Sequence, residues 1–274
     1  SDRQPSQKTE LRPRSKRIDA PKHRAMHYAI IAAGEGSRLR EEGIDTPKPL
    51  VRLCGVTLLE RLIGMFRSQP DCESVSIIIN PSSGKYLDST GASGKAPWED
   101  ADNVIFGTTQ GSMHSLAALR SCLAGSREFC LTTVDTVFRP EEFDRYLECF
   151  RNDSDADGYM AVTTYIDDEK PLYISTDRDG IITGFFDTPR PDTIHVSGGV
   201  YTLPTTALDI LDECMKAGLT RMRDFQRALA ASGMRLKAYP FSRIIDIDHA
   251  DDIPKATLLA HPSDNQPSSQ YGGH

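Results

Sequence analysis

The chain has 274 residues, of which 38% are hydrophobic and 26% are charged, and its formal net charge is −7. This composition is typical of a globular protein with a sizeable core and excludes a chain that is disordered throughout. The negative charge disfavours nonspecific binding to nucleic acid, and no apolar run approaches the roughly 20 residues that cross a bilayer. Because the N-terminus has basic residues without the apolar segment of a secretory signal, we expect a cytoplasmic protein.

The two ends of the chain differ in composition from the rest. Residues 1–24 hold eight Lys or Arg against three Asp or Glu, together with three prolines. We expect residues 1–25 to form a disordered basic arm: a solvated tail, sequence upstream of a natural start at Met26, or a contact with a membrane surface or nucleic acid. Residues 261–274 are polar and turn-rich, and we expect a second disordered tail there. The folded domain is thus predicted over residues 26–260.

Between the ends, short apolar runs alternate with helical patterns up to about residue 166. The apolar runs predict strands at 27–33, 75–79, 103–107, 127–134 and 158–166. The segments between them predict helices at 57–68, 112–124 and 140–150. Strands that alternate with helices are typical of a layered α/β fold with a mostly parallel sheet.

The pattern changes after about residue 167. Apolar runs around a turn at 177–180 predict antiparallel or mixed strands at 171–176, 181–187 and 195–203. Two helices at 204–218 and 221–233, a strand at 234–241 and a mixed segment at 243–260 follow. We therefore predict one domain of the α/β class, with three α/β/α layers around a mixed, mostly parallel central sheet.

The six cysteines lie far apart and include no CxxC pair, so their spacing suggests neither a zinc site nor a disulfide framework. We expect reduced thiols, with Cys122 and Cys130 on core faces.

A glycine-rich turn, Ala33-Gly34-Glu35-Gly36-Ser37-Arg38, follows the first predicted strand, and Lys48 follows in the run Thr-Pro-Lys-Pro-Leu. Such a turn lets backbone N–H groups approach phosphate oxygens, and the helix after it would add the positive end of its dipole. The turn is not a Walker A loop, and the dinucleotide fingerprint fails because Leu39 stands at its third glycine position. Arg38 and Lys48 could instead hold a triphosphate and neutralise charge on a leaving pyrophosphate. The alternative is an ordinary glycine turn with surface cations.

Acidic residues stand at the end of one predicted strand and along a later extended segment. Asp135 follows the strand at 127–134, at the C-terminal edge where open α/β sheets bind ligands, although a turn-forming aspartate is the alternative. Asp246 and Asp248 alternate along an extended segment, so both carboxylates face one side and could bind one cation with Asp135, while the isoleucines beside them face the core. We favour Asp246 over Asp248 as a direct ligand, because Asp248 could also be the N-cap of the last helix.

The turn and the Pro-Lys run together resemble the signature of the sugar-phosphate nucleotidyltransferases, or pyrophosphorylases. The resemblance implies their three-layer nucleotidyltransferase fold, with phosphate contacts at Arg38 and Lys48. It also implies Mg²⁺ as cofactor, bound by Asp135 and by Asp246 or Asp248. The turn would wrap the nucleotide through Ala33, Gly34, Gly36 and Ser37.

Two later segments extend the resemblance. Gln110-Gly111-Ser112 looks like the family's Gly-Thr/Ser segment that packs against the base, where a glycine lets the loop lie flat and the Ser112 hydroxyl can cap the helix. Ser197-Gly198-Gly199-Val200-Tyr201 is similar to the family's Asn-x-Gly-[Ile/Val]-Tyr strand, which meets the sugar.

Two departures concern the acceptor. Ser197 replaces the usual asparagine, and Thr188 stands where many members carry the lysine of Glu-Lys-Pro, a charge that Arg190 could supply instead. Lys170, in an earlier Glu-Lys-Pro, is predicted at the surface. The departures leave room for phosphocholine or another phosphate monoester as acceptor.

These observations predict a Mg²⁺-dependent nucleotidyltransferase that couples an NTP to a phosphorylated small molecule, with a sugar 1-phosphate favoured, and releases pyrophosphate. The acceptor phosphate is already a nucleophile at neutral pH, so catalysis would be positioning and charge stabilisation, with Arg38, Lys48 and Asp135 as the central residues. We expect no specific nucleic-acid partner and no transmembrane segment; the chain could form a homo-oligomer.

Three alternatives remain open: a GT-A glycosyltransferase, a phosphocholine cytidylyltransferase-like enzyme, and a non-catalytic nucleotide-sensing module. GT-A enzymes normally carry Asp-x-Asp at mid-chain, where this chain has Val134-Asp135-Thr136. The sensing module would bind nucleotide without turnover.

Overall fold

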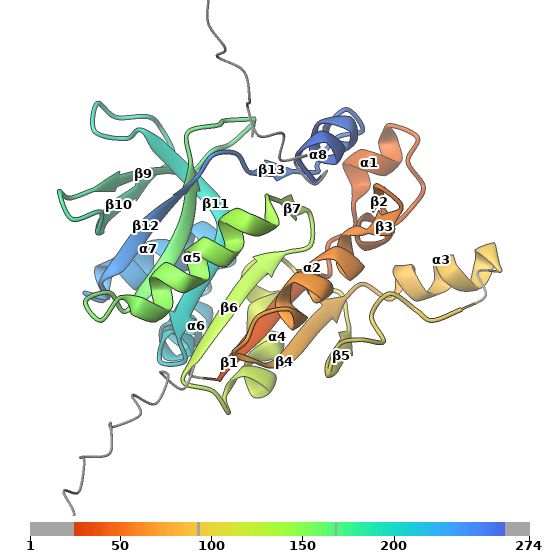
Figure 1. Ribbon diagram of the computed structural model, residues 1–274, viewed down its shortest axis with the longest axis horizontal. Coiled ribbons are helices and arrows are strands. Elements are labelled where there is room, and N and C mark those ends of the chain that lie inside the picture. Colours follow the sequence, from red (N-terminus) through yellow and green to blue (C-terminus); the bar gives the residue numbers. More distant parts are fainter. Residues whose placement is uncertain (1–24, 92–93, 168, 261–274) are drawn as a thin grey trace, which may run out of the picture.

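The computed structural model describes residues 25–91, 94–167 and 169–260. The arm and the tail that the sequence predicts at 1–25 and 261–274 lie outside these residues, apart from residue 25. A central sheet of nine strands has helices on both faces (Figure 1). The predicted three-layer α/β fold with a mixed, mostly parallel sheet is therefore confirmed.

The sheet follows the order β10-β9-β11-β6-β1-β4-β5, and β8 pairs with β11 and β12. The strands are β1 (Met26–Ala32), β4 (Cys72–Ile79), β5 (Asn103–Phe106), β6 (Glu128–Thr133), β8 (Gly158–Thr163), β9 (Tyr173–Thr176), β10 (Ile182–Phe186), β11 (His195–Pro204) and β12 (Leu236–Phe241). Strands β6, β1, β4 and β5 are parallel, whereas β11 runs antiparallel to β6 and β8. The chain leaves β1 toward β4 and later returns to its other side at β6, so a crevice forms at the carboxyl ends of β1 and β6, where such sheets bind ligands.

Helices α2 and α5 cover one face of the sheet, and α4, α6 and α7 cover the other, while α8 packs on β13, β2 and β7 beyond the edge of the sheet (Figure 1). The helices are α1 (Ser37–Glu41), α2 (Leu58–Arg67), α3 (Ser82–Thr90), α4 (Ser112–Leu123), α5 (Pro140–Asn152), α6 (Ala207–Lys216), α7 (Met222–Ala231) and α8 (Asp252–Ala260), with a 3₁₀ helix, η1, at Lys48–Leu50. Two short antiparallel pairs complete the fold: β2 (Arg52–Leu53) with β3 (Val56–Thr57), and β7 (Thr136–Val137) with the distant β13 (Ile245–Asp246).

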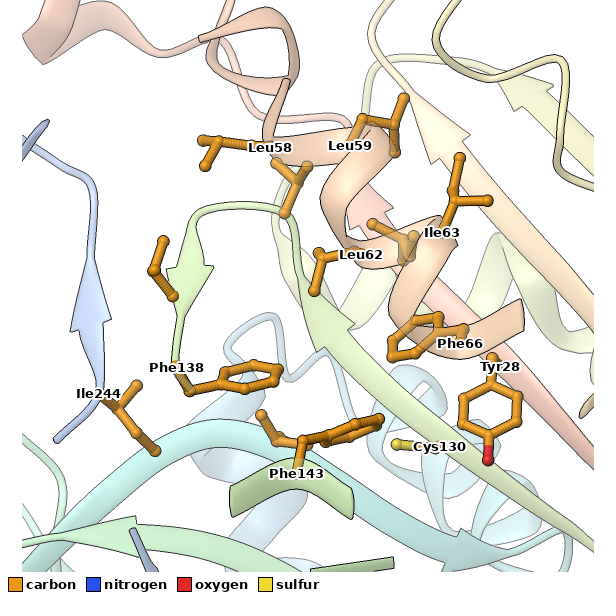
Figure 2. Close-up of a cluster of buried hydrophobic side chains, with 14 of the residues drawn as sticks. Tyr28, Leu58, Leu59, Leu62, Ile63, Phe66, Cys130, Phe138, Phe143 and Ile244 are labelled. Carbon is orange, nitrogen blue, oxygen red and sulfur yellow. The ribbon is translucent and has the colours of Figure 1, made fainter. Parts of the chain in front are cut away.

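Strand β1 lies at the centre of the core because both of its faces are apolar. Tyr28 and Ile30 pack with α2 and α5, while Ala29 and Ile31 pack with α4 on the other face, as the alternation of side chains along a strand requires. Figure 2 shows Tyr28 beside Phe66 of α2, with ring centroids 4.8 Å apart. This rigid strand delivers the glycine-rich turn to the carboxyl edge of the sheet.

The predicted strands and helices are present with small shifts at their ends. The strand expected at 158–166 ends at Thr163 and lies between β11 and β12, outside the parallel block. Helix α3 and the short pairs were not predicted from the sequence. All six cysteines are free, as expected, although Cys122 is only partly buried. Over the described residues, the structure contains no helix long and apolar enough to cross a membrane.

Candidate active site

The glycine-rich turn connects β1 to α1. Gly36 has φ 62° and ψ 36°, a left-handed conformation that costs glycine little. The side chain of Asn80 donates a hydrogen bond of 3.2 Å to the carbonyl of Ala33 and holds the start of the turn. Gly34 has open space where a side chain would begin, so a ligand can approach its backbone closely. Helix α1, from Ser37, has only five residues, so its dipole is smaller than we expected from the sequence.

Lys48 lies beside this turn at the first residue of η1, where a Cβ atom added to Gly36 would be 3.7 Å from the Lys48 Cβ. Its Nζ donates to Asp135 Oδ2 at 2.8 Å and to Asp248 Oδ1 at 2.9 Å, and its side chain is 15% exposed. Burial acts to lower the pKa of Lys48, but the two carboxylates together raise it above its usual value. Lys48 is therefore a fixed positive charge at neutral pH.

Asp135 follows β6, the neighbour of β1, and so reaches the same crevice. Burial acts to raise the pKa of Asp135, whereas the ammonium of Lys48 lowers it further, and the net result is a pKa below the usual value. The carboxylate is thus ionised and available to a cation or to Lys48.

Arg38 and Lys48 share the carboxylate of Asp248. Arg38 Nη1 donates to Asp248 Oδ2 at 3.2 Å, and Arg38 Nη2 lies 3.6 Å from Glu169 Oε2. From the sequence, Asp248 could also have been the N-cap of the last helix. That alternative is wrong, because α8 begins only at Asp252, four residues later. The carboxylate of Asp252 instead accepts the N–H groups of Asp248 and of the next residue.

Asp246 reaches the site through the pairing of β13 with β7, which places it opposite Thr136. The hydroxyl of Thr136 donates to Asp246 Oδ1 at 2.9 Å and lies 2.7 Å from the hydroxyl of Thr133. Thr133 in turn contacts Asp135 and helps to lower its pKa. Two threonine hydroxyls therefore connect the two carboxylates, and the isoleucines that flank Asp246 are buried in the core, as predicted.

These carboxylates suit a magnesium ion better than a metal that needs a complete protein cage. Within the described ranges, no group of three or more His, Cys, Asp or Glu side chains is arranged to hold a metal ion. Mg²⁺ is usually bound by one or two carboxylates, with substrate phosphates and water as its other ligands. Asp135 and Asp246 fit this donor set.

A cavity of about 430 Å³ opens beside Asp246, between the first turns of α4 and α7. Gln110, Gly111 and Ser112 line it from α4, and residues 220–223 line it from α7. The two helices approach so closely that a Cβ on Gly111 would be 3.1 Å from the Thr220 carbonyl. Two helix N-termini thus face one cavity, an arrangement that favours an anionic ligand. Gly111, not Ser112, is the N-cap of α4, so the expected Ser112 cap is wrong.

The glycines of β11 lie close to the residues around Asp246, and Gly199 lines this cavity together with Asp246. Gly199 has φ 74°, and a Cβ there would lie 3.0 Å from Thr136 Oγ1. A Cβ on Gly198 would lie 2.2 Å from Ile244 Cδ1. Only glycine permits this close contact, which sets the cavity wall directly against the threonine that holds Asp246.

Three cationic residues line the cavity: Lys170, Arg221 and Arg223. Lys170 is exposed, as predicted, yet it belongs to this wall. Arg190, which the sequence suggested as a source of charge for the acceptor, stacks its guanidinium over Phe186 at 3.5 Å and is not among the described residues that line this cavity.

The structure thus brings Arg38, Lys48, Asp135, Asp246 and Asp248 into one region and joins it to two cavities. A second, smaller cavity under the glycine-rich turn has Gly34, Gly36, Lys48, Ser112 and Asp135 in its lining. The predicted residues Gln110, Gly111, Ser197 and Gly199 line the larger cavity, and Gly198 lines a neighbouring one beside Arg38.

Sequence reasoning missed three contributors, Thr136, Arg223 and Gln226. A signal existed for Gln226, which is 2% exposed and stands beside Phe225 on the apolar face of α7. A polar residue at a core position of an amphipathic helix indicates a specific partner.

A family model described as the MobA-like NTP transferase domain matches residues 28–196. A bifunctional IPC transferase and DIPP synthase of Rubrobacter xylanophilus is 27% identical over 230 residues, which are 82% of this chain and 50% of that protein. The chain spans about half the length, or less, of the curated relatives it matches.

Solved structures share the fold. A putative glucose-1-phosphate thymidylyltransferase from Bacillus anthracis has a TM-score of 0.70 at 18% identity, covering 86% of this chain and 95% of that one. The inositol-1-phosphate CTP transferase from T. maritima has a TM-score of 0.64 at 16% identity, covering 87% and 98%.

Proposed function

Since the chain belongs to the family of MobA-like NTP transferase domains, we propose that it is a nucleotidyltransferase that couples an NTP to a phosphorylated small molecule and releases pyrophosphate. The observation that carries the proposal is the cluster of Lys48 with Asp135 and Asp248 at the carboxyl ends of β1 and β6. The cluster places carboxylates beside the glycine-rich turn, a turn of the kind that binds phosphate. Both lie at the position where open α/β sheets bind ligands.

In this proposal the glycine-rich turn and Ser37 hold the triphosphate through backbone N–H groups. Arg38 and Lys48 contact its outer phosphates, and their charges stabilise the negative charge that moves onto pyrophosphate. Lys48 suits this task because its flanking carboxylates keep it protonated. Gln110, Gly111 and Ser112 contact the base.

Asp135 and Asp246 would hold a Mg²⁺ ion, with Asp248 as the alternative ligand. When bound, the ion would supply positive charge that neutralises the phosphates of the NTP. The threonine hydroxyls between the two carboxylates keep Asp246 oriented. Ser197, Gly198 and Gly199 form the wall against which the acceptor lies, so that its phosphate faces the α-phosphate of the NTP.

We favour a sugar 1-phosphate or a related polyol phosphate as acceptor. Two matched proteins carry names of this kind, glucose-1-phosphate thymidylyltransferase and inositol-1-phosphate CTP transferase. The cavity supports the choice, because its three cations and the N-terminus of α7 suit a phosphate.

The test is pyrophosphate release from each of the four NTPs with Mg²⁺ and a panel of acceptors: glucose 1-phosphate, myo-inositol 1-phosphate and phosphocholine. We expect Lys48→Met and Asp135→Asn to lower turnover by about 10²–10³. Lys85→Met and Asp88→Asn, on the exposed side of α3, are the matched controls and should leave turnover unchanged.

Other results would contradict the proposal. NTP binding without pyrophosphate release would indicate a sensing module. Transfer from a finished nucleotide sugar would indicate a glycosyltransferase. Unchanged turnover in both Lys48→Met and Asp135→Asn would remove these residues from the site.

A further inference from the structure

Gln226 is a polar residue on the buried, otherwise apolar face of α7, and it lies in the wall of the large cavity. It lies one turn after the cationic start of α7, is 2% exposed, and lines the cavity together with Ser197. Its Nε2 donates a hydrogen bond of 2.8 Å to Ser197 Oγ. A buried amide is stable only when it is hydrogen-bonded, so this contact fixes both side chains.

This contact leaves the Ser197 hydroxyl its own proton to donate. A hydroxyl has one proton and two acceptor lone pairs. Because Ser197 Oγ accepts from Gln226, its own proton points elsewhere, either to the hydroxyl of Tyr201 or to a ligand in the cavity. Tyr201 also lines the cavity and hydrogen-bonds with Ser197. Burial raises the pKa of Tyr201 to about 12, although Ser197 acts in the opposite direction, so the phenol stays neutral.

The lining of this cavity holds both charged and uncharged side chains. Gln226, Ser197 and Tyr201, which we call the neutral wall, carry no charge, whereas the other lining residues include Asp246, Lys170 and the arginines of α7, which are paired with Asp224 and Asp187. A phosphate monoester likewise has a charged end and an uncharged remainder. With its phosphate toward the charged residues, the remainder lies against the neutral wall, which offers amide and hydroxyl groups.

The neutral wall suits hydroxyl groups and does not suit a quaternary ammonium. Cations of that kind are bound by cages of several aromatic rings or by excess negative charge. Among the described residues that line the cavity, Tyr201 is the one aromatic side chain, and cations outnumber Asp246.

We propose that Gln226 is a positioning residue that orients the hydroxyl of Ser197 toward a hydroxyl-bearing acceptor, and that this pair selects polyol phosphates over phosphocholine. The inference rests on the proposed function and adds to it a specificity-determining residue from α7. A hydrogen bond of this kind discriminates because only an acceptor that carries a hydroxyl can pair with the proton of Ser197.

The test compares Gln226→Met and Ser197→Ala with wild type by steady-state pyrophosphate release on myo-inositol 1-phosphate, glucose 1-phosphate and phosphocholine. We expect each variant to raise the KM for the polyol phosphates by roughly three- to tenfold, the effect of one hydrogen bond. The KM for the NTP and the kcat/KM for phosphocholine should not change. Gln69→Met, which removes a buried glutamine amide far from the cavity, controls for general loss of packing and should alter neither KM.

A second variant covers the case in which Gln226→Met folds poorly. Gln226→Glu keeps the shape but introduces a carboxyl group that ionises as the pH rises and repels the acceptor phosphate. The KM for the polyol phosphate should then increase with pH while the KM for the NTP follows wild type, a signature that a purely structural role would not give.

Each outcome is decisive. If Gln226→Met folds and its KM values are unchanged, the inference is overturned and the proposed function still stands. Wild-type turnover with phosphocholine and not with the polyol phosphates also overturns it and leaves the proposed function standing. Wild-type protein that releases no pyrophosphate with any acceptor overturns the proposed function and this inference with it.

Discussion

Asp248 contacts both cations that the proposed reaction places on the triphosphate. Its two carboxylate oxygens accept from Lys48 and from Arg38. Phosphate oxygens use the same donors, so an NTP has to compete with Asp248 for them. On the proposed function, the residue would therefore weaken nucleotide binding unless it also binds the metal ion.

We expect Asp248→Asn to lower the KM for the NTP. The ion pairs are partly exposed, with Asp248 at 39%, so their loss corresponds to about 0.5–1 kcal/mol, or roughly two- to fivefold in KM. Pyrophosphate release at saturating acceptor and varied NTP measures this change, with kcat expected to stay near wild type. A collapse of kcat that extra Mg²⁺ restores would instead make Asp248 a metal ligand.

At the level of secondary structure, the C-terminal end of α5 joins the two halves of the sheet. Arg151 forms a two-pronged ion pair with Asp71, at 2.6 and 2.7 Å, and Asp71 also accepts from the Tyr28 hydroxyl on β1. Two residues later, Asp153 accepts from Lys237 of β12. The C-terminal end of α5 therefore contacts both β1 and β12, which lie far apart in the sequence.

Arg151→Met should destabilise the fold strongly without changing the site. It leaves the carboxylate of Asp71, whose side chain is 0% exposed, without its cation, and breaking a buried pair in this way costs about 3–5 kcal/mol. Urea unfolding measures the change. Arg67→Met, which removes the more exposed pair with Asp102, is the matched control and should cost less than about 1 kcal/mol. Equal losses in the two variants would show that burial of Asp71 is unimportant.

Asp153 makes stability depend on pH. Hydrogen bonds from Lys237 at 2.9 Å and from the Tyr159 hydroxyl at 2.7 Å hold the pKa of Asp153 well below the usual 3.8. Because the pKa is lower in the folded than in the unfolded protein, the charged carboxylate stabilises the fold at any pH where Asp153 is ionised in both states. This stability is lost as the pH falls from about 4 through the folded-state pKa.

The difference in unfolding free energy between wild type and Asp153→Asn should therefore be largest near pH 7 and shrink below pH 4. Denaturant unfolding at several pH values measures it, and Asp155→Asn, which removes the same charge from an exposed position, is the control. A difference that stays constant from pH 7 to pH 3 would contradict the assignment.

For the whole molecule, the sequence was sufficient to predict the α/β class and most of the sheet. Strands such as β1 and β6 are continuous apolar runs, which buried parallel strands require, and their ends locate the glycine-rich turn and Asp135. Local patterns were enough because each of these features is specified within about ten residues.

Contacts between distant segments could not be predicted in the same way. Lys48 and Asp248 are 200 residues apart, and their ion pair exists because β13 pairs with β7 and brings residues 246–248 over the end of β6. The bond between Gln226 and Ser197 likewise depends on how α7 packs on the sheet. Alternation along 246–248 predicted two carboxylates on one side but could not show which partner each would meet.

The core closes within residues 26–260, where Met26 is 1% and Leu259 is 6% exposed. We propose that these residues form the complete catalytic unit of the chain. A protein of residues 25–260 should therefore unfold in one transition at the same temperature as the full chain, with equal pyrophosphate release. Calorimetry and the pyrophosphate assay measure both. A loss of activity at unchanged melting temperature would assign a role to the basic arm or the tail.

The two walls of the large cavity come from different stretches of the chain. The side next to the turn is built before residue 196, within the segment that matches the family model, whereas Ser197, Arg223 and Gln226 follow it. On the proposed function, divergence in one contiguous stretch, from β11 to α7, would change the contacts to the acceptor and leave Arg38, Lys48 and Asp135 in place. Exchanging that stretch between relatives would then be a route to a different choice of acceptor.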